Sequence, residues 1–467
     1  METNFITIDD CTQEVEITLS NSELQPHYNK AYAESAKLIE VPGFRKGKVP
    51  LPIIKQRFGR SIENEALETI ANEEFTTLAR RDNLTILGNP ALRDIRKTPA
   101  GITFVIRYEM IPQFELANYK NLNLVKPVHE ITDEEVQNQI DEMLLQAGNI
   151  VPAEQVTDFM HVATVKFTLL DDETNMPIIG AEPREDQLFL ENEDLDDDLK
   201  NSLMNTRVGD TFNYVAPAES EQELPKRYAC TVVKIEKVIP QEFTDEFAMT
   251  YSKGRMETAE DLRADLKKFL QKSHEDKARQ AIENQIFDIL VDAHDFAVPN
   301  TLVQTVGQVM FDDMKKRMGD GPHVKNLKIQ DFSDMLIGPA TRNARWEIIY
   351  NKIIEDAGLD ITDDDLESYY QVYEKSGEKF TREQLREYFL SEQRIIGPIL
   401  MKKMYDHVIA ESLITEIPLQ EYLRQEEARR AMEDGQIPIS LGGHDHSHEG
   451  HDHSHEGHDH SHEGHNH

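Results

Sequence analysis

The hydrophobic pattern of this 467-residue chain changes its period near Phe243, and this change constrains the fold more than any other feature. Before that point, segments such as VATVKFTLL and YACTVVKIEKV alternate apolar and polar residues, which is typical of half-buried strands. Beyond it, apolar residues recur at helical spacing almost to the end of the chain. A chain of this length also exceeds what a single hydrophobic core can hold. The sequence therefore predicts a multidomain α+β protein whose β-rich part precedes an all-α part.

Residues 1–112 are predicted to form an α+β domain. VEITL (Val15–Leu19) reads as a strand, and Ser22 with Gln25 predicts a capping box at the start of a helix that runs to about Ile39. Pro50 and Pro52 suit the first turn of a second helix. An amphipathic pattern over 62–81 continues that helix, with a buried side made of Ile62, Leu67, Ile70, Phe75 and Leu78. Two further strands are expected around Leu84–Leu87 and Thr103–Met110.

Two segments follow before the helical part. Residues 113–150 predict a helical linker that packs with the C-terminal domain, and a capping box of Thr132 and Glu135 starts its helix. Residues 151–243 predict a small β-rich domain. Its strands are VATVKFTLL, TFNYV and YACTVVKIEKV, with Val165, Phe167 and Leu169 on one side of the first.

Residues 244–440 are predicted to be helical. The longest helix covers roughly 258–295, Pro299 and Asn300 start the next one, and the pairs Thr362/Asp365 and Thr381/Gln384 start later ones. The apolar side of the long helix consists of Leu262, Leu266, Phe269, Ile282, Ile286, Phe287, Ile289 and Leu290. The stripes of this part are rich in Met: Met310, Met314, Met318, Met335, Met401 and Met404. Such stripes form either ordinary interhelical core or a partly open cradle, because Met packs against varied apolar partners.

Charge is distributed very unevenly along the chain. The whole chain carries −37, whereas residues 1–112 hold 14 Lys+Arg against 16 Asp+Glu, a net charge of −2, which leaves −35 for the remainder. Residues 41–62 contain no Asp or Glu and six cations: Arg45, Lys46, Lys48, Lys55, Arg57 and Arg60. A cation cluster kept in an acidic chain indicates an anionic partner, with RNA as the first candidate.

The motif GFRKGKVP, Gly43 to Pro50, lies at the centre of this cluster. Gly43 and Gly47 allow a sharp turn, so Phe44, Arg45 and Lys46 are expected to project together. An exposed aromatic ring beside cations suits a mixed surface of protein and RNA. The other interpretation is a solvated loop that happens to be cationic.

GFRKGKVP, followed by PIIKQRFG, closely resembles the ribosome-docking signature of bacterial trigger factor. FTDEFAMTYSKG (Phe243–Gly254), the ETAEDLRADLKKFL helix and DAHDFAVPNTLV (Asp292–Val303) are similar to the junction and helical body of the same family. The resemblance implies an ATP-independent chaperone that docks at the ribosomal exit tunnel and shields nascent chains. Its implied docking residues are Gly43, Phe44, Arg45, Lys46, Gly47 and Lys48, and its implied partners are a large-subunit protein, ribosomal RNA and unfolded nascent polypeptides. A homodimer off the ribosome stays open.

The same resemblance implies an FKBP-like peptidyl-prolyl isomerase fold for residues 151–243. The sequence departs from that pattern in Glu191–Arg207, where ENEDLDDDLKNSLMNTR contains no glycine, aromatic, valine or isoleucine. A carboxylate-lined surface binds an apolar prolyl ring poorly. We therefore expect a retained scaffold with a degenerate pocket, and we assign no catalytic residue.

The tail, 441–467, is expected to be disordered, because its last 24 residues repeat HDHSHEG and hold no large apolar side chain to bury. The imidazoles suit low-specificity binding of Zn²⁺, Ni²⁺ or Cu²⁺, either adventitious or regulatory. The candidate ligands are His444, His446, His448, His451, His453, His455, His458, His460 and His462. No required cofactor is expected.

Three functions therefore remain in competition: a ribosome-associated chaperone, a prolyl isomerase, and a metal-handling protein that works through its tail.

The two cysteines lie about 220 positions apart, the N-terminus lacks the pattern of a signal peptide, and no stretch approaches the ~20 apolar residues that span a bilayer. We expect a cytoplasmic protein that makes no membrane contact.

Overall fold

The computed structural model describes residues 1–42, 44, 47–171, 174–218, 225–319, 321–376 and 380–433. The predicted His-rich tail lies outside these residues. By its internal contacts the chain divides into two units, Met1–Glu416 and Ile417–His467.

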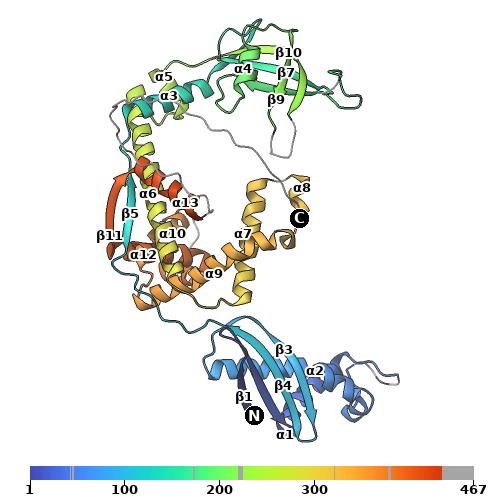
Figure 1. Ribbon diagram of the computed structural model, residues 1–467. Helices are drawn as coiled ribbons and strands as arrows, with labels where there is room; N and C mark the ends of the chain where they lie inside the picture. The colour runs from blue at the N-terminus through green and yellow to red at the C-terminus, as the bar shows by residue number, and fades with distance from the viewer. Residues whose placement is uncertain are drawn as a thin grey trace, which may run out of the picture. The chain divides into compact units, whose positions relative to one another are not determined.

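The N-terminal part of the first unit is an antiparallel sheet packed against two helices (Figure 1). The sheet has the order β1-β2-β4-β3, formed by β1 (Glu2–Thr7), β2 (Thr12–Ser20), β4 (Gly101–Met110) and β3 (Ile86–Thr98). The helices are α1 (Asn21–Leu38) and α2 (Leu51–Arg81). Alternate residues of β2 and β4, such as Ile17 and Phe104, pack against Leu24, Phe75 and Leu78 of the helices in one buried core.

Two local predictions for this domain are wrong. The capping box of α1 is formed by Ser20 and Glu23, two residues before the predicted pair of Ser22 and Gln25. Strand β3 begins at Ile86 and continues to Thr98, well past the predicted end at Leu87. It pairs with β4 through two register shifts, and its exposed charged residues hide the alternation that normally marks a strand. The α2 prediction is confirmed, including all five residues of its buried side.

The next elements are β5 (Asn123–Val128), α3 (Asp133–Gln146) and a β-rich domain. The capping box of Thr132 and Glu135 is confirmed. The domain contains β6 (Asn149–Ala153), β7 (His161–Leu169), β8 (Arg184–Phe189), α4 (Asp197–Leu203), β9 (Thr211–Ala216) and β10 (Lys226–Ile239). Its sheet runs β6-β10-β7-β8, and β9 pairs with β10. The three predicted strands are confirmed as β7, β9 and β10.

The remainder of the first unit is almost entirely helical, as predicted (Figure 1). It contains α5 (Asp245–Tyr251), α6 (Ala259–Asp292), α7 (Asn300–Met318), α8 (Pro322–Lys325), η1 (Ile329–Phe332), α9 (Ser333–Asp356), α10 (Asp363–Ser376), α11 (Arg382–Ser391) and α12 (Gln393–Ala410). Strand β5 pairs with β11 (Leu413–Pro418), and in the second unit the described residues form α13 (Leu419–Glu433).

One core holds the centre of this helical body together. Ile286 and Leu290 of α6 meet Trp346 and Ile349 of α9 and Met404 of α12. The predicted apolar side of α6 is wrong at two positions, because Phe269 and Ile289 are exposed, at 65% and 38%. Every described helix is too short or too polar to cross a membrane.

Candidate functional site

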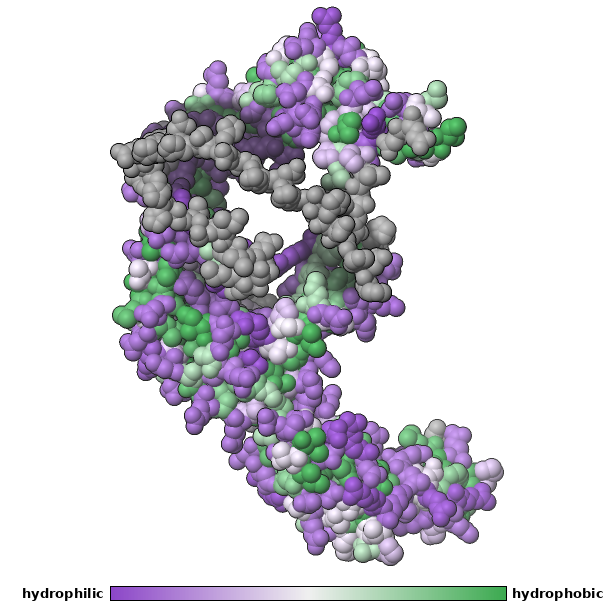
Figure 2. Space-filling model, viewed as in Figure 1, coloured by the Kyte–Doolittle hydropathy of each residue, from purple (hydrophilic) through white to green (hydrophobic). Residues whose placement is uncertain are grey.

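The predicted basic loop joins α1 to α2. We call the exposed end of this connection, Leu38 to Arg60, the docking tip. Of the six predicted docking residues, the structure describes Phe44, Gly47 and Lys48, whereas Gly43, Arg45 and Lys46 lie outside the described residues. Figure 2 shows polar and apolar residues interspersed over this end of the domain.

A small hydrophobic core anchors both ends of the loop. Val41 and Val49 are buried, and they pack with Tyr32 of α1 and with Ile54 and Ile62 of α2. The Phe44 N–H donates to the Val41 carbonyl at 3.0 Å, which closes a tight turn. The flanks are anchored at neighbouring points of one core, whereas the described loop residues Phe44, Gly47 and Lys48 are exposed.

The backbone at Gly47 has a positive φ of 74°. This left-handed conformation costs a residue with a Cβ about 1 kcal/mol or more, so glycine is the residue that the turn favours. The predicted role of Gly47 as a turn residue therefore has a structural cause.

The predicted exposure of Phe44 is confirmed: its side chain is 41% exposed. Leu38, the last residue of α1, and Leu51, the first of α2, are also exposed, at 73% and 47%. Sequence reasoning missed both leucines, because a leucine at a helix end is normally read as part of the core. Their exposure could have been predicted from their positions, because each lies close to the glycine-containing loop. Together with Phe44 they give the docking tip an apolar component.

The described cations of the docking tip have no carboxylate partner. Lys48, Lys55, Arg57 and Arg60 are exposed, and no ion pair among the described residues includes any of them. Lys55 instead lies over the Tyr32 ring, 4.9 Å from its centroid. Burial, together with the hydrogen bond to Glu63, raises the pKa of Tyr32 to about 12, so the ring is neutral at physiological pH. The first turn of α2 carries no acid, so the partial positive charge of the helix end adds to that of the cations.

Some other cations of the same domain are neutralised internally, whereas Lys37, Arg80, Arg93 and Lys97 also form no ion pair among the described residues. Lys30 pairs with Glu73 at 2.5 Å, Arg96 with Glu16 at 2.7 Å, and Arg107 with Glu14 at 2.7 Å. Four described cations without an ion pair lie within residues 48–60, which makes this segment of the docking tip a local source of positive potential.

A second candidate surface lies on α7 and α9, which pack side by side. Val309 and Met318 of α7 and Met335 and Ile337 of α9 are exposed apolar residues. Of the predicted Met-rich stripes, Met404 is buried core, whereas Met318 and Met335 face solvent. Both interpretations of the stripes therefore apply, each to different residues. The exposed ones could hold apolar segments of varied shape.

The predicted degenerate segment of the β-rich domain, Glu191–Arg207, contains helix α4. Leu199 and Leu203 are buried against the sheet, while Asp197 and Asp198 face solvent. The Arg184 guanidinium lies over the rings of Phe167 and Tyr228, at 5.3 and 5.7 Å from their centroids. Phe167 belongs to the buried core of this domain, and Tyr228 packs against that core.

The candidate metal ligands, His444 to His462, lie outside the described residues. In the part of the chain that the structure describes, no group of three or more His, Cys, Asp or Glu could hold a metal ion. Cys11 and Cys230 are buried free thiols.

Comparisons with known proteins agree over most of the chain. A model of the N-terminal part of "Bacterial trigger factor protein (TF)" matches residues 1–143, and a model of the C-terminus of the same protein matches residues 258–410. The chain is similar to the trigger factor of Chlorobium phaeobacteroides, with 28% identity over 428 residues that cover 90% of this chain and 98% of that protein. The trigger factor of Chlorobaculum parvum is 26% identical over 418 residues, covering 89% and 97%. A solved chain from work on promiscuous substrate recognition by the trigger factor chaperone shares 15% identity, with a TM-score of 0.45, and covers 88% of this chain and 100% of that chain.

Proposed function

The chain belongs to the bacterial trigger factor family of ribosome-associated folding chaperones, and from this premise we propose that it docks on the large ribosomal subunit through the docking tip. The cations would contact ribosomal RNA phosphates, and Phe44, Leu38 and Leu51 would contact a protein at the tunnel exit. This proposal includes action in the cytoplasm, on nascent polypeptides and without ATP.

The observation that carries the proposal is the set of described, exposed cations (Lys48, Lys55, Arg57 and Arg60) without an ion pair among the described residues, in the same docking tip as the exposed Phe44 ring. Burying unpaired cations against a protein surface is costly, whereas phosphates neutralise them and release condensed counterions. The apolar residues would add area that excludes water, as anchors do in protein interfaces. The strongly acidic remainder of the chain would be repelled by RNA, which favours attachment by the tip alone.

Co-sedimentation with ribosomes tests the docking tip. We expect the triple substitution of Phe44, Arg45 and Lys46 by Ala to abolish pelleting while the circular dichroism spectrum stays unchanged. The matched control is Lys30→Ala, which removes a cation that Glu73 already neutralises and should pellet like wild type. Unchanged pelleting of the triple variant at moderate salt would refute the docking tip.

We further propose that α7 and α9 shield apolar client segments. Exposed Val309, Met318, Met335 and Ile337 offer contact area without a fixed shape, which suits weak binding of many sequences. Aggregation of an unfolded client, followed by light scattering, should be suppressed less by a variant in which Met318 and Met335 are replaced by Gln. Equal suppression by the variant and the wild type would exclude this surface.

Prolyl isomerase activity is the alternative function. The family property is an FKBP-like isomerase domain, but we propose that this chain has little such activity, since the segment Glu191–Arg207 is rich in acids and holds no aromatic residue that could line a prolyl pocket. A proline-limited refolding assay separates the functions, because uncatalysed isomerisation takes ~10–100 s. Suppressed aggregation without faster refolding supports the chaperone, whereas a clear acceleration of the slow phase would show that the isomerase activity is retained.

The His-rich tail gives a third, less favoured proposal, which rests on sequence alone. Its spaced imidazoles and carboxylates would bind Zn²⁺, Ni²⁺ or Cu²⁺ with low specificity. Calorimetric titration of the full chain and of a chain lacking 442–467 tests binding, and chaperone activity should survive the deletion. Loss of that activity would instead favour a metal-handling protein. A homodimer off the ribosome is also proposed, and sedimentation velocity at several concentrations checks it.

A further inference from the structure

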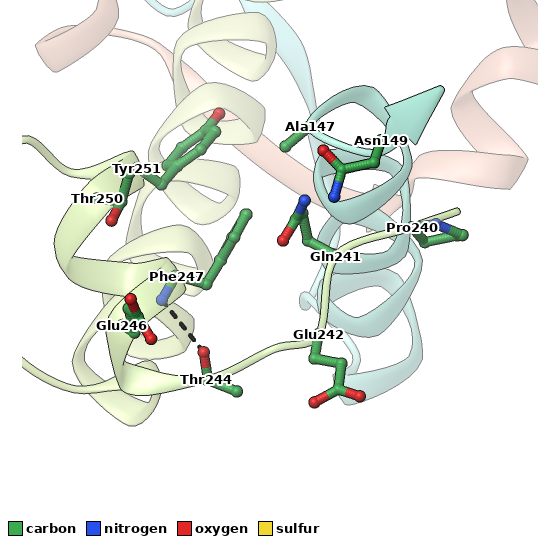
Figure 3. A pocket seen from close by; sticks show the side chains of 10 residues that line it. All are labelled: Ala147, Asn149, Pro240, Gln241, Glu242, Thr244, Glu246, Phe247, Thr250 and Tyr251. Carbon is green, nitrogen blue, oxygen red and sulfur yellow. Dashed lines mark hydrogen bonds between the residues drawn. The ribbon is translucent and has the colours of Figure 1, made fainter. Parts of the chain in front are cut away.

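A pocket of about 610 Å³ lies between the end of the linker helix, the β-rich domain and the first helix of the helical body (Figure 3). Its walls come from the end of α3 and the start of β6, from the segment after β10, and from α5. The lining residues are Ala147, Asn149, Pro240, Gln241, Glu242, Thr244, Glu246, Phe247, Thr250 and Tyr251. None of them has a role in the docking tip or in the surface of α7 and α9.

The walls of this pocket are held by the structure around them. The Gln241 N–H donates to the Leu144 carbonyl at 3.0 Å, which ties the segment after β10 to α3. Asn149 pairs with Ile239 in the ladder between β6 and β10. Phe247 packs on one side into the cores that α3, α5 and α6 share. The pocket is therefore formed before any ligand binds, which lowers the entropic cost of binding.

One wall is aromatic. The rings of Phe247 and Tyr251 stack with their centroids 5.6 Å apart and their planes at 24°. Phe247 is half-buried, while Tyr251 is 50% exposed, so the pair offers a fixed apolar platform with an open face. Platforms of this kind bind prolyl rings in extended peptides, whose preformed helix loses little entropy on binding.

The opposite wall offers unused amide groups. Figure 3 shows the side-chain amides of Asn149 and Gln241 on the side of the pocket that faces Phe247. Neither amide has a hydrogen-bond partner among the described residues. Each amide can donate and accept, which is what a peptide backbone requires of a side chain that binds it. Gln241 is half-buried, so a ligand that satisfies its amide gains more than one that bonds a fully solvated group.

The rim of the pocket is acidic. Glu242 and Glu246 are both exposed at its edge, and no cation is among the lining residues. Their carboxylates favour a ligand with Lys or Arg beside the residue that enters the pocket.

We propose that this pocket binds an extended, proline-containing peptide segment flanked by basic residues. The prolyl ring lies on Phe247 and Tyr251, the amides of Asn149 and Gln241 bond the peptide backbone, and the glutamates attract the flanking cations. This site goes beyond the proposed ribosome docking and does not depend on it.

Fluorescence anisotropy of the full chain with a labelled peptide, Arg-Leu-Pro-Pro-Leu-Pro-Arg, tests the proposal. We expect Gln241→Ala and Tyr251→Ala each to raise the Kd by about fivefold or more, as loss of a central interface residue does. Met249→Ala is the matched control: Met249 is 51% exposed on the same helix as Tyr251 but does not line the pocket. Its Kd should equal that of wild type.

Two further measurements make the outcome decisive. A peptide with Ala in place of every Pro should bind about fivefold more weakly or worse. Equal binding of this peptide, or an unchanged Kd for both pocket variants, would overturn the proposal. Both pocket variants should pellet with ribosomes like wild type. A failure of peptide binding is thereby distinguished from a failure of ribosome docking, which only the docking-tip variants measure.

Discussion

The salt dependence of ribosome binding gives the sharpest test of the docking tip. We consider the double substitution Arg57→Gln and Arg60→Gln on the first turns of α2. Both side chains are exposed and neither forms an ion pair among the described residues, so their loss should leave the fold intact. Any effect on binding then reports contacts with the ribosome.

The magnitude follows from counterion release. Each phosphate contact contributes about 0.9 to the slope of log K against log salt concentration. If Lys48, Lys55, Arg57 and Arg60 each contact one phosphate, these four contacts account for a roughly 150-fold fall in wild-type affinity between about 50 and about 200 mM salt, to which Arg45 and Lys46 would add. The double variant has two contacts fewer, so its affinity should fall roughly 12-fold less than that of wild type over the same range. Its slope is therefore smaller by about 1.8, and its affinity at low salt is much weaker.

Ribosome pelleting at five or six salt concentrations, with quantified bound fractions, provides the slopes. The charge-matched control is Arg81→Gln with Arg96→Gln, because Asp82 and Glu16 already neutralise these two arginines. We expect the control to keep the wild-type slope. If the Arg57/Arg60 variant keeps that slope as well, Arg57 and Arg60 of the wild type do not contact phosphate, and the proposed docking through these two cations is refuted.

Three further predictions concern the fold. Gly47→Ala should destabilise the docking tip by about 1 kcal/mol because the backbone there is left-handed, and ribosome pelleting should weaken with no change in overall helix content by circular dichroism. Ile349→Ala, at a fully buried position of α9, should lower the free energy of unfolding by about 2–5 kcal/mol. Ile337→Ala, at an exposed position of the same helix, should change it by less than about 0.5 kcal/mol. Urea titration followed by the fluorescence of the single tryptophan measures both. The pKa of Glu135 is lowered to about 2, chiefly because its carboxylate accepts a hydrogen bond from the Thr132 backbone N–H. The ionised carboxylate therefore contributes its full stabilisation of the fold above a pH of about 4.5, and this contribution is lost as the pH falls toward 2. The stability advantage of wild type over Glu135→Gln should shrink over that range, and a constant advantage would contradict this cause.

Local sequence patterns predicted most element starts, since these depend on a few neighbouring residues. Thr132 with Glu135 and Thr381 with Gln384 cap their helices as predicted. The one wrong capping box shows the limit of the rule, since both Ser20 and Ser22 are followed three residues later by a suitable partner. The end of β2 at Ser20 decides between them, because the strand pairs with β4 up to that residue.

Helical periodicity predicted which residues share a face but not which part of that face is covered. Leu262 and Leu266 of α6 pack against α3 and α5, whereas Phe269, on the same predicted side, is exposed. Coverage depends on where another segment lies, and the sequence of α6 holds no information about that. Leu38 and Leu51 of the docking tip were missed for the same reason.

The sequence by itself determined the order of the domains, their helical or strand character, and the basic loop within an acidic chain, because periodicity, capping and charge are local properties. Only the tertiary structure decided which cations lack an internal carboxylate, which apolar residues face solvent, and that Asn149 and Phe247, about 100 residues apart, line one pocket. These properties arise from contacts between distant segments, which form only when the chain packs.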